Sequence, residues 1–159
     1  METEIELKDT EKNDLEELFR FQTDEEANFL AAFTAENPLD KTAYLEKFTK
    51  ILSDKKIINK TIFFSGKIAG SVAKFMFEGK PEITYWIGKD FWGKGIATQA
   101  LKQLLEIEKT RPIYARVAFD NVGSKKVLER CGFEKIGTDK FFANARRREI
   151  EEIIYELKN

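Results

Sequence analysis

The chain has 159 residues, of which 42% are apolar, so it can fold as one domain that buries about 70% of its unfolded surface. No apolar run approaches the ~20 residues of a membrane span, and the acidic residues at the start, 1–4, lack the basic and apolar sections of a signal peptide. There is no histidine and one cysteine, Cys131, which excludes an internal disulfide, a Cys–His nucleophile pair and an ordinary zinc site. We therefore expect a cytoplasmic protein with a single domain over residues 1–159, no metal and no membrane contact.

The first third of the chain reads as a short strand followed by helices. Ile5 and Leu7 alternate with charged residues, as in a strand with one buried face. Apolar residues then recur at helical spacing in two groups: Leu15, Leu18, Phe19, Phe29, Leu30 and Phe33 in the first, and Tyr44, Leu45, Phe48, Ile51 and Leu52 in the second.

From residue 57 onward the apolar period changes to that of strands. A hairpin is predicted over 61–77 with its turn at 65–67, and a turn at 79–81 leads into a third strand, Pro81–Ile87. The elements predicted beyond it are a helix over 96–108 that stops before Pro112, a strand Ile113–Phe119, a helix Val122–Cys131 ended by Gly132, and a closing strand pair, Phe133–Phe142 and Glu149–Leu157. We expect most of the 14 phenylalanines to lie in the core.

Charge is distributed unevenly, although the formal net charge is only −1. Residues 1–40 carry 13 Asp and Glu against 3 Lys and Arg, whereas residues 41–159 carry 15 against 24. Solvated helix surfaces explain most such patterns, but a functional interpretation gives the molecule an acidic side for a cationic ligand and a basic side for an anionic one. The basic clusters Lys125–Lys126 and Arg146–Arg148 lack interleaved aromatic residues, so we expect no nucleic-acid partner and a solvated hairpin tip at 146–148.

The most informative stretch is the loop Phe91–Thr98, which joins the strand Pro81–Ile87 to the next helix and reads FWGKGIAT. Glycines let the backbone approach a ligand closely, and the first N–H groups of a helix have no partner within the helix. These amides, together with the positive end of the helix dipole, bind phosphate groups. The loop therefore predicts a phosphorylated cofactor, with a ligand-free structural turn as the alternative.

Two common nucleotide-binding motifs do not fit this loop. The dinucleotide fingerprint requires a third glycine where Thr98 stands, and the P-loop requires Ser or Thr after a Gly-Lys pair, whereas Gly95 follows Gly93-Lys94. A mononucleotide-binding protein is an alternative that thermal stabilisation by ATP or NAD would reveal.

A second motif directly follows the predicted strand Ile113–Phe119. It begins with Asp120-Asn121-Val122-Gly123-Ser124 and ends with Gly132-Phe133. Together, the glycine loop and this Asn-x-x-Ser…Gly-Phe segment resemble the GNAT superfamily of acetyl-CoA-dependent N-acetyltransferases, closest to its ribosomal-protein N-terminal acetyltransferase-like (RimJ/RimL-type) branch. The specific resemblance covers residues 82–133. Trp92 replaces the polar first residue of the family's Gln/Arg-x-x-Gly-x-Gly/Ala loop, as is common in that branch.

The resemblance implies an α+β GNAT fold and acetyl-CoA as co-substrate. It implies a mixed, mostly antiparallel sheet of about seven strands flanked by helices, whose fourth and fifth strands, Pro81–Ile87 and Ile113–Phe119, splay apart so that the pantetheine arm pairs with the fourth like an added strand. The cofactor-binding residues implied are the backbone of the fourth strand, the glycine loop and the second motif: Trp86, Ile87, Gly88, Gly93, Lys94, Gly95, Ile96, Ala97, Thr98, Asn121, Ser124 and Lys126. Lys125 is an alternative to Lys126, and a helix cap is the alternative role for Asn121.

Transfer of an acetyl group to an amine requires the amine to lose a proton. At pH 7 this costs about 4.6 kcal/mol for a lysine-type amine but only about 1–1.4 kcal/mol for an α-amine. Because the chain has no histidine, the base must be a carboxylate that acts directly or through water. Glu82, at the start of the fourth strand and near the splay, is the predicted base or acceptor-orienting residue, and Glu25 and Glu26 are the alternatives.

The leaving thiolate requires less assistance, since a thiol has a pKa near 8.5. Many family members protonate it with a tyrosine at the position occupied here by Leu128. In the branch that the chain resembles, the serine of Asn-x-x-Ser, here Ser124, takes this role, and a purely structural first-turn residue is the alternative. Leu128, Cys131 and Phe133 are expected in the core.

The sequence thus predicts an N-acetyltransferase that moves acetyl from acetyl-CoA to a primary amine by direct attack in a ternary complex. The acceptor is a protein or peptide N-terminus or a small-molecule amine, and the acidic front favours a cationic one. A non-catalytic CoA-binding module with a lost acceptor site is the alternative that Leu128 suggests. The chain is expected to be a monomer or a homodimer, and residues 20–45, which would form the acceptor pocket, carry no motif that identifies the acceptor.

Overall fold

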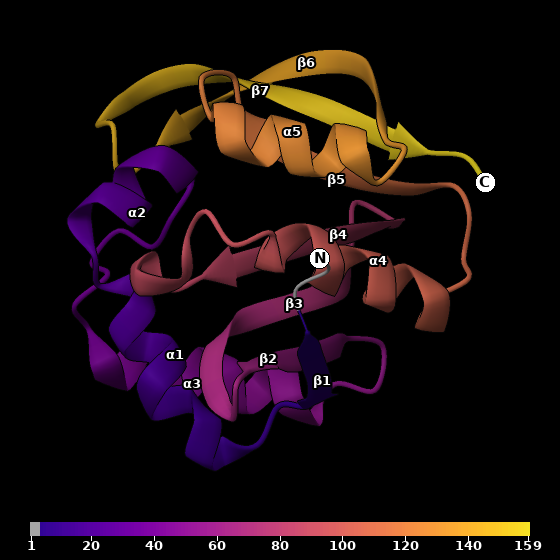
Figure 1. Cartoon of the computed structure of the whole chain (residues 1–159). Coiled ribbons are helices and arrows are strands. Elements are labelled where there is room, and N and C mark those ends of the chain that lie inside the picture. Colours follow the sequence, from indigo (N-terminus) through magenta and orange to yellow (C-terminus); the bar gives the residue numbers. More distant parts are fainter. Residues whose placement is uncertain (1–3) are drawn as a thin grey trace.

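The structure, a computed structural model that describes residues 4–159, is built on a seven-stranded sheet in the order β1-β2-β3-β4-β5-β7-β6 (Figure 1). The strands are β1 (Ile5–Asp9), β2 (Ile58–Phe64), β3 (Lys67–Phe77), β4 (Lys80–Ile87), β5 (Ile113–Ala118), β6 (Glu134–Ala143) and β7 (Arg148–Leu157). The helices are α1 (Leu15–Gln22), α2 (Glu25–Ala31), α3 (Lys41–Ser53), α4 (Ile96–Ile107) and α5 (Val122–Arg130), with 3-10 turns η1 (Lys12–Asp14) and η2 (Lys89–Phe91). Neighbouring strands are antiparallel except β4 and β5, which are parallel.

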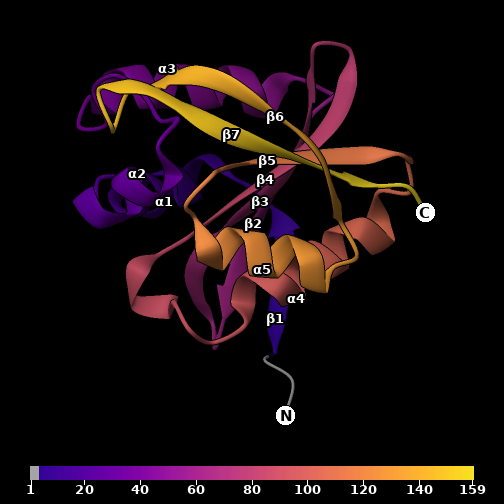
Figure 2. The same cartoon turned by 90° about the horizontal axis from the view of Figure 1, so that it is seen from above.

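Helices cover both faces of the sheet (Figure 2). On the α4/α5 face, apolar residues of the strands pack against the buried side of α4 and against Leu128 of α5. On the opposite face, here called the α1/α3 face, α1 and α3 form a second cluster that includes Trp86. Because successive side chains of a strand point to opposite faces, Ile83, Tyr85 and Ile87 of β4 contact the α4/α5 core, whereas Trp86 lies on the α1/α3 face.

The strands β4 and β5 are joined near one end only. Glu82 and Tyr114 form the single register pair of this parallel ladder among the described residues, while β5 pairs along its whole length with β7 on its other side. The two strands therefore form a fork, closed at Glu82 and Tyr114 and open toward Ile87 and Ala118. This fork is the splay that the sequence predicted.

The predicted order of strands and helices is confirmed, including the meander of β2, β3 and β4 and the closing pair β6–β7. The expectation that most phenylalanines lie in the core is wrong. Among the described residues only Phe21 and Phe133 are fully buried, and four are exposed by 37–59%: Phe29, Phe119, Phe141 and Phe142. These four lie on the edge strand β6, on the short helix α2 or just after β5, where no helix covers them. No helix of the described residues is long and apolar enough to span a membrane.

Candidate active site

The glycine loop leads into an uncapped helix N-terminus. Gly93 and Gly95 both have φ +77°, a left-handed conformation that favours glycine, and a Cβ on Gly93 would point into open space. Gly95 is the N-cap residue of α4 and makes no side-chain cap, and Gln99 N donates to Gly95 O at 3.1 Å. The N–H groups of Ile96, Ala97 and Thr98 therefore precede the first intrahelical bond and are oriented outward at the positive end of α4.

The loop is fixed at its start by aromatic residues. Trp92 Nε1 donates to Ile87 O at 2.8 Å, which ties the loop back to the end of β4. The Phe91 ring makes edge contacts with Phe21 and Phe64, at centroid distances of 6.2 and 6.3 Å. These contacts hold the loop rigidly against the sheet, so its amides have a defined direction.

The register of β3 and β4 decides which backbone groups face the fork. Gly88 N donates to Ala69 O at 2.8 Å, and in an antiparallel pair the residues bonded to the partner alternate. Gly88 and Trp86 therefore direct their backbone groups toward β3, while Tyr85 and Ile87 direct theirs toward β5. The backbone groups of Trp86 and Gly88 thus face β3, which speaks against the expectation that they bind the cofactor, whereas those of Tyr85 and Ile87 face the fork.

The requirement for glycine at position 88 has a structural cause. A Cβ at this position would lie 2.7 Å from the ring of Phe21. The residue is therefore small because α1 packs closely against the end of β4, and no ligand is needed to explain it.

The second motif forms the first turn of α5. Asn121 Oδ1 accepts from Ser124 N at 3.2 Å, so Asn121 caps the helix, and its Nδ2 donates to Leu30 O at 3.2 Å. The hydroxyl of Tyr85, on β4, lies 3.5 Å from Ser124 O, and burial raises the pKa of Tyr85 to about 12. Ser124 therefore sits at the open end of the fork, next to β4, while both polar ends of the Asn121 side chain contact protein groups.

The other predicted residues of this region lie where the sequence placed them. Lys94 and Lys126 are exposed, on the glycine loop and on α5. Leu128 and Phe133 are buried, which confirms them as core residues. Cys131 packs against the same core, its Sγ lies 3.7 Å from Thr98 O, and burial raises the pKa of its thiol, as expected for a packed thiol.

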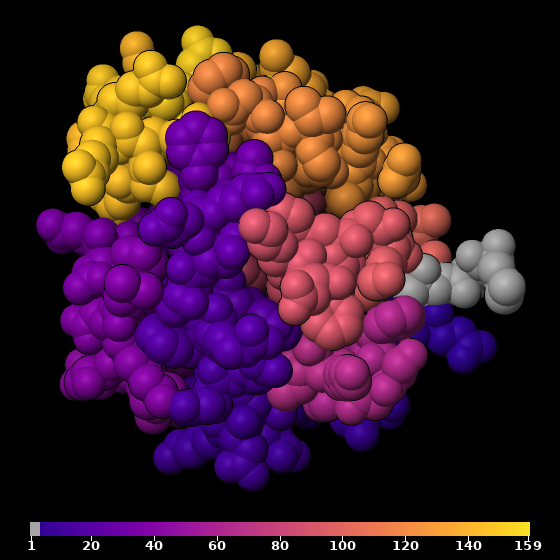
Figure 3. Space-filling view, turned by 60° about the vertical axis from the view of Figure 1, so that its left-hand side comes forward, coloured from indigo at the N-terminus to yellow at the C-terminus, as the bar shows by residue number. Residues whose placement is uncertain are grey.

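The helix α2 bridges the two sides of the open end of the fork. At its start, Glu26 pairs with Lys89, just after β4, at 3.3 Å. At its end, Phe29 O accepts a hydrogen bond from Arg146 Nε at 2.7 Å, and Arg146 forms two bonds of 2.9 Å with the carboxylate of Asp120, just after β5. Figure 3 shows this N-terminal segment, in indigo, against both the glycine-loop region and the C-terminal third of the chain.

The contacts of Arg146 correct one expectation. Its side chain is only 2% exposed, and its guanidinium lies 3.9 Å from the centroid of the Phe29 ring. The expected solvated hairpin tip at 146–148 is therefore wrong for Arg146, because α2 covers this turn. Arg147 and Arg148 are exposed, as expected.

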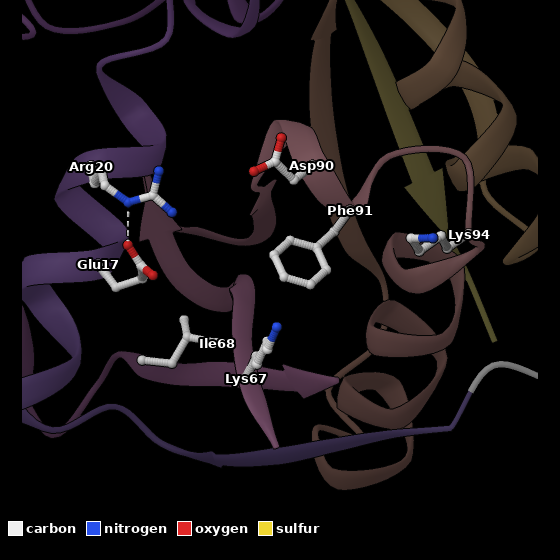
Figure 4. Close-up of a pocket in the computed structure, with 7 residues that line it drawn as sticks. All are labelled: Glu17, Arg20, Lys67, Ile68, Asp90, Phe91 and Lys94. Carbon is white, nitrogen blue, oxygen red and sulfur yellow. Dashed lines mark hydrogen bonds and ion pairs between the residues drawn. The ribbon is translucent and has the colours of Figure 1, made fainter. Parts of the chain in front are cut away.

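A surface pocket of about 630 Å³ lies beside the glycine loop (Figure 4). Figure 4 shows its walls: α1 on one side, η2 and the loop on the other, and the start of β3 below. The pocket is lined by Glu17, Arg20, Lys67, Ile68, Asp90, Phe91 and Lys94. None of these residues belongs to β5 or α5, so this pocket is separate from the fork.

Glu82 lies at the closed end of the fork on the α1/α3 face. Its side chain is 5% exposed, and its Oε2 accepts from Arg116 Nε of β5 at 3.1 Å. Burial raises the pKa of the Glu82 carboxyl, and the bond to Arg116 opposes that shift. Glu25, by contrast, is exposed on the outer surface of α2, and Glu26 is paired with Lys89.

Sequence reasoning missed several residues in or beside the predicted site. Tyr85 and Arg116 contact Ser124 and Glu82, Glu152 contacts Arg116, and Asp120 and Arg146 pair with each other just beyond β5. For Arg116 a signal was present, because it is the one charged residue of β5, whereas Glu152 is one of several charged residues of β7 and does not stand out. For Asp120 and Arg146 none was available, since their pairing depends on how the β6–β7 turn folds back onto the end of β5.

Comparison with known proteins agrees with this geometry. Residues 4–134 match the family model of the acetyltransferase (GNAT) domain. Over 139 residues the chain is 30% identical to YdaF of Bacillus subtilis (strain 168), whose name assigns it provisionally to the ribosomal N-acetyltransferases; the match covers 79% of this chain and 74% of YdaF.

Solved structures show the same fold. The microcin C7 self-immunity acetyltransferase MccE, in complex with acetyl-CoA and AMP, superimposes with a TM-score of 0.78 at 24% identity over 98% of this chain and 93% of that one. The ribosomal L7/L12 α-N-protein acetyltransferase RimL, in complex with coenzyme A, gives a TM-score of 0.80 at 18% identity over 97% and 93%. The chain therefore belongs to the GNAT acetyltransferase family and is an N-acetyltransferase.

Proposed function

We propose that the protein transfers the acetyl group of acetyl-CoA to a primary amine, by direct attack in a ternary complex. The observation that carries this proposal is the uncapped N-terminus of α4, which follows two left-handed glycines and lies at the open end of a fork between parallel strands. MccE and RimL, which share the fold, were solved with acetyl-CoA and with coenzyme A. The residues present here fit the same co-substrate.

In this proposal the co-substrate runs from the glycine loop into the fork. The pyrophosphate accepts hydrogen bonds from the amides at the start of α4, with Lys94 and Lys126 near the adenosine phosphates. The pantetheine arm lies along β4 and pairs with the backbone of Tyr85 and Ile87 like an added strand. The Ile87 carbonyl already accepts from Trp92, so Ile87 contributes its N–H.

The chemistry then takes place within the fork, between Glu82 at its closed end and Ser124 at its open end. The amine enters from the α1/α3 face, onto which Glu82 projects, and loses a proton to Glu82 directly or through a water. Its nitrogen attacks the thioester carbon and the new C–N bond forms; the nitrogen then gives its second proton to solvent water, and the C–S bond breaks with its electron pair passing to sulfur. The hydroxyl of Ser124 supplies a hydrogen bond or a proton to the thiolate, and solvent restores the serine.

The acceptor that fits this account best is the α-amine of a peptide or protein. An α-amine costs about 3 kcal/mol less to deprotonate at pH 7 than a lysine side chain, which suits a site with a single carboxylate base. The names of YdaF and RimL refer to ribosomal-protein acceptors. A cationic acceptor also matches the excess of acidic residues in 1–40.

A non-catalytic CoA-binding module is the second candidate, because Leu128 is fully buried where many family members place the proton-donating tyrosine. A turnover assay separates the two. The protein is incubated with acetyl-CoA and a panel of N-terminal peptides, amino-acid amides, polyamines and aminoglycosides, and thiol release and acetylated products are measured. We expect turnover with at least one amine, and peptides acetylated at the α-amine. Tight CoA binding without product from any amine would favour the module.

A further inference from the structure

One guanidinium at the closed end of the fork connects three strands. Arg116 lies on β5, two residues beyond the Glu82–Tyr114 register pair. Its Nε donates to Glu82 Oε2 of β4 at 3.1 Å, and its Nη1 lies 3.3 Å from Glu152 Oε1 of β7 and 3.6 Å from Asp139 Oδ2 of β6. The ion pair with Glu82 therefore crosses the fork just beyond the point where the two strands separate.

The guanidinium is also held by aromatic rings. Its central carbon lies 4.9 Å from the ring centroid of Phe77, on β3, and 5.9 Å from that of Phe141, on β6. A planar guanidinium that stacks on rings and bonds carboxylates through separate nitrogens has little freedom to turn. Contacts from β3, β6 and β7, together with β5 itself, consequently fix the direction of its Nε–H bond. This bond in turn fixes the position of the Glu82 carboxylate.

The charges around this cluster are not balanced. Glu82 and Glu152 have side chains 5% and 11% exposed, and within residues 4–159 the one cation paired with both is the guanidinium of Arg116. Burial raises the pKa of both carboxyls, the bonds to Arg116 oppose this, and Glu82 and Asp139 raise that of Glu152 further. Glu78 and Lys80, at the start of β4, act on Glu82 with opposite signs.

We propose that Arg116 is the positioning residue for Glu82: it binds Oε2 of the carboxylate, holds it ionised on the α1/α3 face, and so directs the second oxygen toward the incoming amine. Glu152 modulates the strength of the Arg116–Glu82 ion pair, because it binds the same guanidinium. The proposal rests on the role of Glu82 in the proposed function, and extends the site to β7.

The proposal predicts different effects on the pH profile of kcat/KM for two variants that each neutralise one charge. Arg116→Gln removes the cation, so the desolvated Glu82 carboxylate binds a proton more readily, and the acidic limb of the pH profile of kcat/KM moves to higher pH. Each pH unit of that movement lowers kcat/KM about tenfold below the limb. Glu152→Gln removes one of the two other carboxylates that bind Arg116, leaving Glu82 and Asp139, and removes a negative charge near Glu82, so the limb stays or moves to lower pH.

The experiment measures this pH profile, with an α-amine peptide as acceptor, for the wild type, both variants and Arg116→Lys. Arg116→Lys keeps the charge but not the planar fork, so we expect a limb near that of the wild type and a lowered kcat. Lys60→Gln, which breaks the pair with Asp9 near the far edge of the sheet, controls for loss of an ion pair and should leave the profile unchanged.

Melting with and without coenzyme A, measured on the same samples, separates this proposal from the proposed function. A wild type that neither binds coenzyme A nor turns over contradicts the proposed function. An active Arg116→Gln variant whose limb does not move to higher pH, or an active Glu152→Gln variant whose limb does move to higher pH, overturns the role of Arg116. If Arg116→Gln does not fold, two other results together overturn the role of Arg116. These are an unchanged kcat and acidic limb in Arg116→Lys, and a shift of the acidic limb to higher pH in Glu152→Gln.

Discussion

At the residue scale, the account depends most on Glu82, a buried carboxylate at the point where β4 and β5 separate. If it accepts the proton of the amine, Glu82→Gln lowers the rate by about 10²–10⁴-fold, and the loss shrinks as the pH approaches the pKa of the amine. If Glu82 only orients the acceptor, the loss is the same at every pH. Steady-state rates across the pH range decide between these roles. Unchanged rates in Glu82→Gln would instead assign the role of base to water or to Glu25 and Glu26.

Ser124 provides a second test at this scale, on the thiolate side of the reaction. Ser124→Ala should lower the rate by less than Glu82→Gln does, since a thiolate with a pKa near 8.5 leaves tolerably without a proton. The dissociation constant of coenzyme A should change little, because the hydroxyl is proposed to meet only the sulfur end. A large loss of coenzyme A affinity would instead assign Ser124 to binding.

Leu128 stands where many family members have a proton-donating tyrosine. Because Leu128 is buried, we expect that a tyrosine cannot simply be restored at this position. The side chain is 0% exposed within the main core, so Leu128→Tyr adds volume and a hydroxyl to a packed site and should destabilise the fold by about 1–3 kcal/mol. Leu128→Met, which conserves volume, should cost less than about 1.5 kcal/mol. Chemical denaturation measures both. A stable, faster Leu128→Tyr enzyme would show that the position can reach the thiolate.

At the scale of elements, α2 contacts the chain on both sides of the open end of the fork, so weakening its attachment should affect both sides. Arg146→Ala removes the two bonds to Asp120 and the bond to Phe29 O and should cost about 1–3 kcal/mol, the range for bonds to charged groups. Hydrogen exchange should quicken in α2 more than in α3. Equal protection of α2 in both proteins would show that its attachment lies elsewhere.

The same contact gives a pH dependence with a defined sign. Arg146 lowers the pKa of Asp120, and a carboxyl whose folded pKa is depressed contributes stability that is present above its unfolded pKa and lost as the pH falls through the folded one. The difference in unfolding free energy between wild type and Asp120→Asn should therefore be constant near neutrality and begin to fall as the pH drops below about 4, the unfolded pKa of an aspartate. A difference that does not fall on acidification below about pH 4 would refute an ionic origin.

Elements with a clear period could be predicted from the sequence, whereas contacts between elements could not. The glycine loop and the Asn121 motif are local, so their helix N-termini follow from residue order alone. The direction of backbone groups on β4 depends on its register with β3, which no local pattern encodes, so the sequence could not show that the backbone of Trp86 faces β3 and that of Tyr85 faces the fork. Arg116 and Arg146 were missed for the same reason, because their partners come from strands and turns distant in sequence.

At the scale of the whole molecule, the uneven charge distribution should affect how the acceptor binds. If the acidic residues of 1–40 attract a cationic acceptor, its KM should rise with ionic strength as screening grows. A neutral amine measured in parallel should show no such rise, which controls for salt effects on coenzyme A. A salt-independent KM for the cation would mean that the asymmetry only keeps the surface solvated.

The central claim, that the glycine loop binds the co-substrate, is tested most directly by thermal melting with coenzyme A. At ~100 times its dissociation constant the ligand should stabilise the wild type by about 2.7 kcal/mol. Gly95→Asp places a negative charge where the pyrophosphate is proposed to lie and should abolish the shift. Gly66→Asp, in the β2–β3 turn with the same φ of +77° and nothing within 4 Å of a Cβ, carries the same backbone strain and should keep it. No shift for the wild type at millimolar coenzyme A, or an undiminished shift in Gly95→Asp, would contradict the account.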